Sequence, residues 1–248
     1  MKSLLKMTWM EAKLFLREPV SAFFTLIFPL LMLFIFGSIY GNTPPPGSSS
    51  SQGAIGSLIP AFSAMVIGMV GLMPITITLA TYRENGILRR LGATPVSPLV
   101  VMSAQVIVVF IMTILGVILL VLAGMLVYHV QFEGNVFSVL AGFTLGSLSF
   151  FGIGFILAST MPTARTAQIV ALVLLYPMLI LSGAGWPREL MPATVAKLSA
   201  FLPLTYVVNL LRGLWIGEAW GQHTTDVIIL LVMLVAGVFI SVKLFRWE

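Results

Sequence analysis

The chain has 248 residues, of which 59% are hydrophobic and 8% are charged, and its formal net charge is +5. A mean hydropathy of +1.08 leaves too little polar surface to cover a soluble globule of this size, so the composition excludes a water-soluble domain and indicates a polytopic membrane protein. The absence of cysteine excludes disulfide bonds and thiolate metal sites.

Residues 1–19 predict an amphipathic helix lying in the plane of the membrane surface. Spacings of 4, 7 and 4 place four cations on one helical face: Lys2, Lys6, Lys13 and Arg17. Such a face suits contact with anionic membrane lipid. Glu11 and Glu18 lie on the other side among apolar residues, and the sequence does not identify a partner for either.

The rest of the chain, residues 20–248, predicts a single all-α transmembrane domain with six spans. Uncharged stretches long enough to cross a bilayer as helices lie at about residues 20–42, 54–82, 98–130, 135–162, 167–186 and 227–242, and the last span extends to about residues 224–244. Prolines inside spans should kink them, at Pro29, Pro60, Pro74 and Pro177. Gly142 and Gly146 form a small-xxx-small face suited to close helix packing.

A charged segment lies between the second and third spans. Residues 83–95 begin with Arg83 and Glu84, continue with Arg89 and Arg90, and end at Pro95. At 100° per residue the apolar and basic side chains fall on opposite stripes, which predicts a short amphipathic helix at the lipid surface. A positively charged loop that only fixes topology is the alternative.

The distribution of cations predicts the orientation. With both termini in the cytoplasm, ten of the thirteen Lys and Arg residues are cytoplasmic: Lys2, Lys6, Lys13, Arg17, Arg83, Arg89, Arg90, Arg165, Lys243 and Arg246. We therefore expect a multi-pass protein of the plasma or inner membrane with segment 83–95 on the cytoplasmic side. These cations follow the inner leaflet and form no continuous patch, so nucleic acid is not an expected partner.

The outer segment after the fifth span, residues 187–223, predicts short re-entrant helices. Between Lys197 and Arg212 the uncharged stretch is interrupted by Pro203 and is too short to cross the membrane. Trp residues flank it, as is typical of the headgroup level: Trp186, Trp215 and Trp220.

The sequence predicts neither a catalytic residue nor a metal site. No Asp, Glu, Lys or Arg lies in the uncharged stretches of the expected spans, which disfavours an ion-coupled pump. There is no phosphate-binding loop, and no Lys between Lys13 and Lys197, so any energy from ATP must come through another subunit. His129 and His223 are expected at the outer surface and do not suggest a metal or catalytic pair.

These features together resemble the permease subunits of type-2 ATP-binding-cassette (ABC) exporters, which include bacterial multidrug, antibiotic and glycolipid exporters. Segment 83–95 is similar to that family's coupling helix, which sits in a groove of the ATPase. The resemblance implies coupling residues Arg83, Glu84, Gly86, Leu88, Arg89, Arg90, Leu91, Thr94 and Pro95. Tyr82 stands where many relatives carry Glu.

The outer segment also resembles the family, through residues 181–187 and 202–206 followed by Leu211 and Arg212. This resemblance implies an outer gate formed by Trp186, Pro187, Pro203, Leu204, Thr205, Tyr206 and Arg212. It further implies a dimer with an identical or different permease and two copies of an ABC ATPase. ATP and Mg²⁺ would bind to the ATPase, and this chain would bind no cofactor.

The aromatic pattern predicts the class of cargo. Most Trp and Tyr residues fall at span ends, whereas the spans carry soft apolar side chains, which fit varied hydrophobic ligands. We therefore expect export of a hydrophobic or amphipathic drug or lipid along Phe28, Met69, Met73 and Tyr176. Four alternatives remain: Phe and Met side chains that only face lipid, a lipid-linked glycan as cargo, an intramembrane lipid-modifying enzyme, and a passive channel.

Overall fold

The computed structural model describes residues 2–41, 53–93, 97–185 and 197–244, and these residues contain helices and no strands. The first part holds α1 (Lys2–Arg17), α2 (Pro19–Ala22), the π-helical segment η1 (Phe23–Ile27), α3 (Phe28–Tyr40), α4 (Ala54–Glu84) and α5 (Ile87–Gly92). The second part holds α6 (Pro98–Tyr128), α7 (Val136–Thr160), α8 (Ala164–Leu181), α10 (Pro203–Trp215), the 3₁₀ segment η3 (Trp220–His223) and α11 (Thr224–Leu244).

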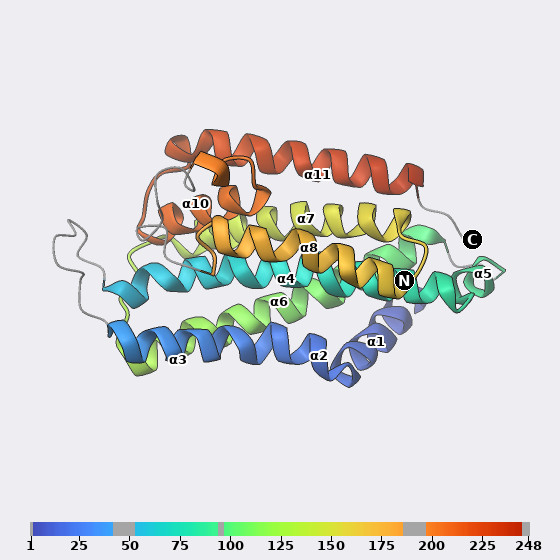
Figure 1. Cartoon of the computed structure of the whole chain (residues 1–248), viewed down its shortest axis with the longest axis horizontal. Coiled ribbons are helices and arrows are strands. Elements are labelled where there is room, and N and C mark those ends of the chain that lie inside the picture. Colours follow the sequence, from blue (N-terminus) through green and yellow to red (C-terminus); the bar gives the residue numbers. More distant parts are fainter. Residues whose placement is uncertain (1, 42–52, 94–96, 186–196, 245–248) are drawn as a thin grey trace.

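Six of these helical stretches are long and apolar enough to cross a membrane, which confirms the all-α class and the predicted count. They run side by side as one bundle, with both chain ends and α5 at one end and α10 toward the other (Figure 1). The chain ends and the charged segment after α4 therefore share one side of the bundle.

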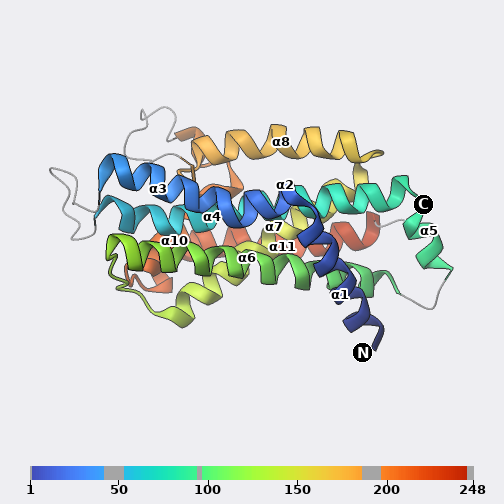
Figure 2. The ribbon, with the colours of Figure 1, turned by 90° about the horizontal axis from the view of Figure 1, so that it is seen from below.

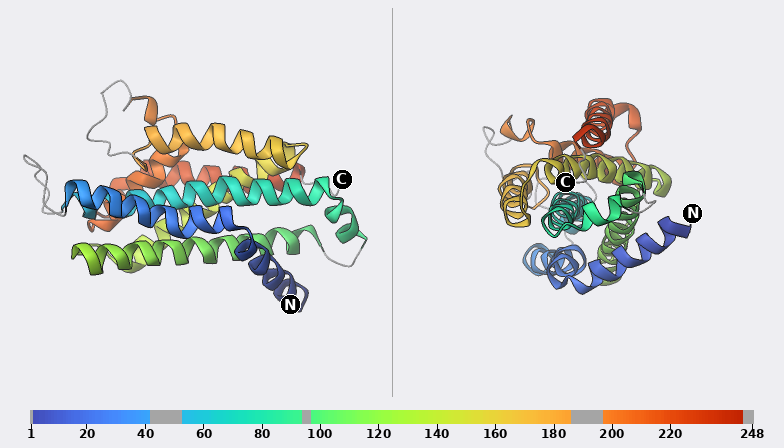
Figure 3. Two further views of the ribbon diagram at one scale, coloured as in Figure 1. Left: turned by 60° about the horizontal axis from the view of Figure 1, so that its bottom comes forward. Right: turned by 90° about the vertical axis from the view of Figure 1, so that its right-hand side faces the viewer.

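α4 is the central helix of the bundle. In its apolar window 94% of residues are buried, against 22% for the stretch that contains α11. The view along the bundle shows α3, α6, α7 and α8 around α4, with α11 beyond α7 (Figure 3). This matches the sequence of α4, which is apolar on all sides and has no polar face to present to water.

Glycines allow α7 to approach its neighbours closely. The predicted small face is confirmed: a Cβ on Gly142 would lie 2.7 Å from Leu214 Cδ1 of α10, and one on Gly146 would lie 3.0 Å from Val207 Cγ1. Farther along α7, a Cβ on Gly154 would collide with the carbonyl oxygen of Gly71 in α4. Close backbone approach of this kind is typical of helix packing in membrane proteins.

The predicted effect of proline appears at Pro29. This residue lies in the first turn of α3, which begins directly after η1. Because proline has no backbone N–H, it cannot donate the α-helical hydrogen bond to the Thr25 carbonyl oxygen. Gly116 of α6 approaches that carbonyl so closely that a Cβ would lie 2.6 Å from its oxygen. In contrast, α4 continues as helix through Pro60 and Pro74, and α8 continues through Pro177.

α1 leaves the bundle at an angle and crosses beside α6 at the end that carries α5 (Figure 2). Met7 packs with Val101 and Ala104 of α6, and farther along Phe15 packs with Val108 and Met112. The opposite face of α1 is exposed and includes Leu5 and Trp9, which are 76% and 66% exposed.

Candidate functional site

The charged segment is built differently from the single helix expected over residues 83–95. α4 continues through Glu84, the chain turns at Asn85 and Gly86, and α5 spans only Ile87–Gly92. Gly86 has φ 65° and ψ 17°, a left-handed conformation that glycine adopts without a Cβ clash. A left-handed glycine after the last helical turn is a common helix terminator. Gly86 therefore ends α4 within the segment 83–95 that was expected to form one helix.

Arg83 and Glu84 are therefore at the end of α4 and not on α5, and both contact the bundle. Arg83 Nη1 donates to the carbonyl oxygens of Ala158 and Met161 at the carboxyl end of α7, at 2.9 and 3.0 Å. Glu84 Oε2 accepts from the N–H of Ala164, the first residue of α8, at 2.9 Å. Each charge is opposite in sign to the helix end that it meets. Glu84, which the resemblance places among the coupling residues, thus contacts α8 of the same chain.

α5 has one buried side and one exposed side. Leu88 is fully buried in a cluster with Leu79 of α4 and Phe155 of α7, and Leu91 packs against the cluster that contains Met7 of α1. Arg89 and Arg90 are exposed. α5 thus presents two cations outward while its leucines contact helices of the bundle. Thr94 and Pro95 lie outside the described residues.

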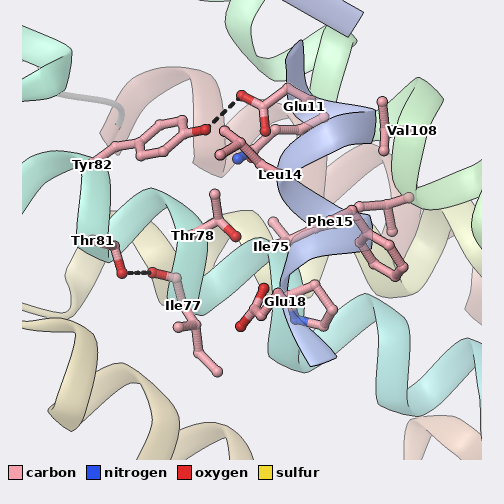
Figure 4. Close-up of a pocket in the computed structure, with 13 residues that line it drawn as sticks. Glu11, Leu14, Phe15, Glu18, Ile75, Ile77, Thr78, Thr81, Tyr82 and Val108 are labelled. Atoms are coloured by element: carbon pink, nitrogen blue, oxygen red, sulfur yellow. Dashed lines mark hydrogen bonds between the residues drawn. The ribbon is translucent and has the colours of Figure 1, made fainter. Parts of the chain in front are cut away.

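Glu11, for which the sequence showed no partner, accepts a hydrogen bond from Tyr82 Oη at 2.9 Å (Figure 4). Both residues are buried, with 5% of Glu11 and 8% of Tyr82 exposed. Burial raises the pKa of the Glu11 carboxyl above its ordinary value, and the hydrogen bond from Tyr82 offsets part of that effect. Tyr82 therefore joins α1 to α4 one residue before Arg83.

The expected cargo path is brought together in part. Met69 and Met73 of α4 line a pocket of about 150 Å³ with Phe24 and Thr25 of η1 and Gln168 of α8. Phe28 packs against the same buried core. Tyr176 instead lies on the outer face of α8 and is 54% exposed, because the helix turns this position away from α4.

Three other soft apolar residues of the spans lie in the buried core. Met65, Phe150 and Phe151 are at most 2% exposed and fill the core between the helices. The soft apolar side chains of the spans therefore include some that fill the core.

At the opposite end of the bundle, the residues expected to form the outer gate fix the start of α10. Thr205 Oγ1 donates to the Ser199 carbonyl oxygen at 2.6 Å, and Tyr206 Oη donates to that of Ala200 at 2.5 Å. Leu204, in the first turn begun by Pro203, is fully buried. Arg212 Nη2 lies 3.5 Å from the Gly183 carbonyl oxygen. Trp186 and Pro187 lie outside the described residues.

Sequence reasoning missed a polar cluster beside the end of α10. His223 Nδ1 lies 3.0 Å from Asp226 Oδ2, and His223 Nε2 lies 2.8 Å from Glu218 Oε2. The i, i+3 spacing of His223 and Asp226 at the start of α11 was the readable signal. Within the described ranges, no group of three His, Cys, Asp or Glu residues is placed to hold a metal ion.

Comparison with known proteins gives a consistent result. The family model described as ABC-2 type transporter matches residues 2–215. The chain is similar to the inner membrane transport permease YhhJ of Escherichia coli K12, with 26% identity over 195 residues that cover 74% of this chain and 50% of YhhJ.

Two further relatives carry similar names. The probable multidrug ABC transporter permease YbhR of Escherichia coli K12 is 23% identical over 163 residues, covering 65% of this chain and 44% of YbhR. The putative transport permease ycf38 of Cyanophora paradoxa is 25% identical over 209 residues, covering 82% of this chain and 71% of ycf38. The aligned part of the chain spans about half the length of YhhJ and YbhR.

Proposed function

Because the chain belongs to the ABC-2 type transporter family, we propose that it exports a hydrophobic or amphipathic molecule using ATP hydrolysed by a separate ATPase subunit. Membership and the six apolar helices make it an integral inner-membrane transport permease. The direction of transport, the cargo and the assembly are the proposed parts. We further propose that two ATPase copies and a second permease complete the exporter, with ATP and Mg²⁺ held by the ATPase.

The arrangement of α5 is the observation that best supports coupling to an ATPase. Arg89 and Arg90 point outward from a helix whose Leu88 is fully buried in the bundle. A helix fixed on one side and cationic on the other can form charge-assisted contacts with an acidic groove and transmit its movement inward. Arg83 and Glu84 belong to the inward side of this connection, because both contact neighbouring helices.

Reversing the two exposed cations tests the coupling role. Arg89→Glu with Arg90→Glu should leave membrane insertion intact and abolish co-purification of the ATPase or its stimulation by cargo. Arg17→Glu with Lys243→Glu is the matched control, since it reverses two cations of the same end outside α5. Wild-type export by the α5 double variant would contradict the assignment.

We propose a cytoplasmic location for both termini and α5. The cation bias supports this orientation. Since the chain has no native cysteine, Asn85→Cys and Gln131→Cys give a clean test at two exposed positions. An impermeant thiol reagent should label Gln131→Cys in intact cells and Asn85→Cys only after permeabilisation; the reverse result would overturn both the orientation and the coupling role.

An apolar or amphipathic cargo is supported by the pocket beside Met69 and Met73, which combines thioether and aromatic surface with Gln168. Multidrug transport appears in the name of the relative YbhR. Purified permease and ATPase in nanodiscs should show ATPase stimulation by lipophilic drugs or lipids. Stimulation by undecaprenyl-linked glycans alone would replace this cargo class with a glycan, and turnover by the permease without ATPase would favour an enzyme.

A further inference from the structure

A second pocket lies between α1, α4 and α6 at the end of the bundle that carries α5. Its volume is about 230 Å³ (Figure 4). Figure 4 shows Glu11 and Glu18 projecting from the α1 side toward Tyr82, Thr78 and Ile77 of α4. None of the coupling or gate residues lines it, so the functions assigned above leave this pocket unexplained.

The charge in this pocket is uncompensated. Glu11 and Glu18 both line it, and none of the described residues that line it is Lys, Arg or His. Their separation of seven residues corresponds to a rise of about 10 Å along a helix, which spreads the two carboxylates along the pocket. Because Glu11 is only 5% exposed, water screens its charge poorly. A bound cation would relieve this cost.

An independent feature on α6 points to a hydrogen-bond donor as the ligand. Gln105 lines the pocket, is 2% exposed, and has no hydrogen-bond partner for its Oε1. A buried acceptor left without a partner costs about 1–3 kcal/mol. Tyr82 Oη is already used by Glu11, and Thr81 Oγ1 donates to the carbonyl oxygen of Ile77. The pocket therefore offers acceptors on two of its walls, at Glu11 and at Gln105.

The remaining lining selects an organic ligand. Apolar side chains from all three helices surround the polar groups: Leu14, Phe15, Ile75, Ile77, Val108 and Val109. Two carboxylates are fewer than the several oxygen ligands that a hard metal cation requires. A primary ammonium supplies positive charge and three N–H donors, as a lysine side chain does, while an attached alkyl chain contacts the apolar walls.

We propose that this pocket binds the ammonium group of an amphiphilic primary amine. The ammonium donates to Glu11 and Gln105, and Glu18, which is half-buried, attracts the cation from the side shared with the neighbouring pocket. The ligand can be an aminophospholipid of the surrounding membrane or an amine that arrives as cargo, since both present the same chemistry. The inference concerns binding alone and does not depend on the proposed export.

Glu18, Pro74 and Ile77 also line the pocket that contains Met69 and Met73. The two pockets are therefore neighbours with Glu18 between them. Burial raises the pKa of Glu11, whereas a bound ammonium favours its ionised form. The titratable groups facing the ligand are Glu11, Glu18 and Tyr82, and affinity should fall as pH falls through the raised pKa of Glu11.

Equilibrium dialysis of radiolabelled dodecylamine tests the proposal. The full chain in phosphatidylcholine nanodiscs is compared with empty nanodiscs at pH 8. We expect one saturable site per chain, at least tenfold weaker binding of dodecyltrimethylammonium, which has no N–H, and no competition by dodecanol. Equal competition by dodecanol or by the quaternary amine would overturn the proposal.

Variants locate the site. Glu11→Gln keeps an acceptor for Tyr82 and should weaken dodecylamine at least tenfold. Gln105→Met provides a second test that leaves the Glu11–Tyr82 bond in place, and it should weaken binding several-fold. Glu133→Gln removes an exposed acid outside the pocket and should bind as wild type. Unchanged binding by both pocket variants would place the amine elsewhere and refute the inference.

The lipid composition of the nanodiscs distinguishes the two sources of the ligand. Replacing part of the phosphatidylcholine by phosphatidylethanolamine should weaken apparent dodecylamine binding if the headgroup amine of that lipid occupies the pocket. Unchanged binding in the two lipid mixtures would assign the pocket to a soluble or cargo amine. Either result is consistent with the ammonium site. Failure to detect saturable dodecylamine binding in both lipid mixtures would refute it.

Discussion

Tyr82 Oη donates a 2.9 Å hydrogen bond to Glu11 Oε1 across 71 residues of sequence. Tyr82 is the first of three consecutive residues at the end of α4, and each of them contacts a different helix. Arg83 contacts the carboxyl end of α7, and Glu84 contacts the amino end of α8. A displacement of α5, which follows two residues later, would therefore be transmitted to α1, α7 and α8 together.

Removing the Tyr82 hydroxyl should weaken the attachment of α1. Tyr82→Phe leaves Glu11 buried without its donor, and we expect a loss of about 1–3 kcal/mol in the free energy of unfolding. Thermal unfolding of the purified chain in detergent measures it. Tyr176→Phe is the matched control, because that ring is 54% exposed on α8, and it should shift stability by less than about 0.5 kcal/mol. Equal shifts in the two variants would show that the Tyr82–Glu11 bond contributes nothing.

Substitutions of Arg83 and Arg89 should have different effects, the first on the stability of the fold and the second on association with the ATPase. Arg83→Met removes donors from two carbonyl oxygens at the end of α7 and should cost about 1–3 kcal/mol. Arg89→Met changes an exposed side chain and should leave the unfolding midpoint unchanged while weakening ATPase association. If Arg89→Met destabilised the isolated chain as much as Arg83→Met, the division of these residues into inward and outward contacts would be wrong.

The close packing of α4 and α7 predicts intolerance of a single methyl group. Gly154→Ala forces a Cβ onto the Gly71 carbonyl oxygen and should cost about 1–3 kcal/mol or prevent accumulation of folded protein. Gly221→Ala is the control, since nothing lies within 4 Å of its added Cβ. Both variants are compared by fluorescence-detected size exclusion, where a normal Gly154→Ala profile with unchanged melting would contradict the packing.

Glu11 should make stability depend on pH. Because its folded pKa is raised above the ordinary value of 4.5, the folded chain holds this proton more tightly than the unfolded chain. The stability from this group is fully present below pH 4.5 and is lost as pH rises through the folded pKa. Glu11→Gln should remove that loss and melt at or above the wild-type temperature at pH 8. A wild-type pH profile in Glu11→Gln would assign the dependence to another group.

The sequence predicted those features that depend on local pattern. Apolar length predicted the six spans, and the four-residue spacing of Gly142 and Gly146 predicted their close packing, here against α10. The break at Gly86 was readable from helix-termination chemistry, but the helical wheel over residues 83–95 was continued through it.

Contacts between distant residues were not predictable in this way. The hydrogen bonds of Tyr82, Arg83 and Glu84 span 71 to 80 residues, and a single helical wheel assigns each side chain only to a face and not to a neighbour. Tyr176 shows the same limit. Its position deep in the span could be predicted from the sequence, but its outward direction depends on where α4 lies.

The His223 cluster gives the last prediction, which concerns the end of the bundle that carries α10. Asp226 and His223 have side chains that are 12% exposed, whereas Glu218 is 38% exposed, so the two carboxylates should contribute unequally. His223→Leu leaves Asp226 buried without its ring donor and should cost about 1–3 kcal/mol. Glu218→Gln disrupts only a solvent-screened contact and should cost less than about 1 kcal/mol.

A double-mutant cycle distinguishes the two arms of this cluster. The coupling energy between His223→Leu and Asp226→Asn should exceed that between His223→Leu and Glu218→Gln, as measured by thermal unfolding of the six chains that make up both cycles. The more buried carboxylate depends more on its contact with the ring, because less water is available to replace that contact. A larger coupling to Glu218 would mean that exposure does not decide which contact holds α11 to the end of α10.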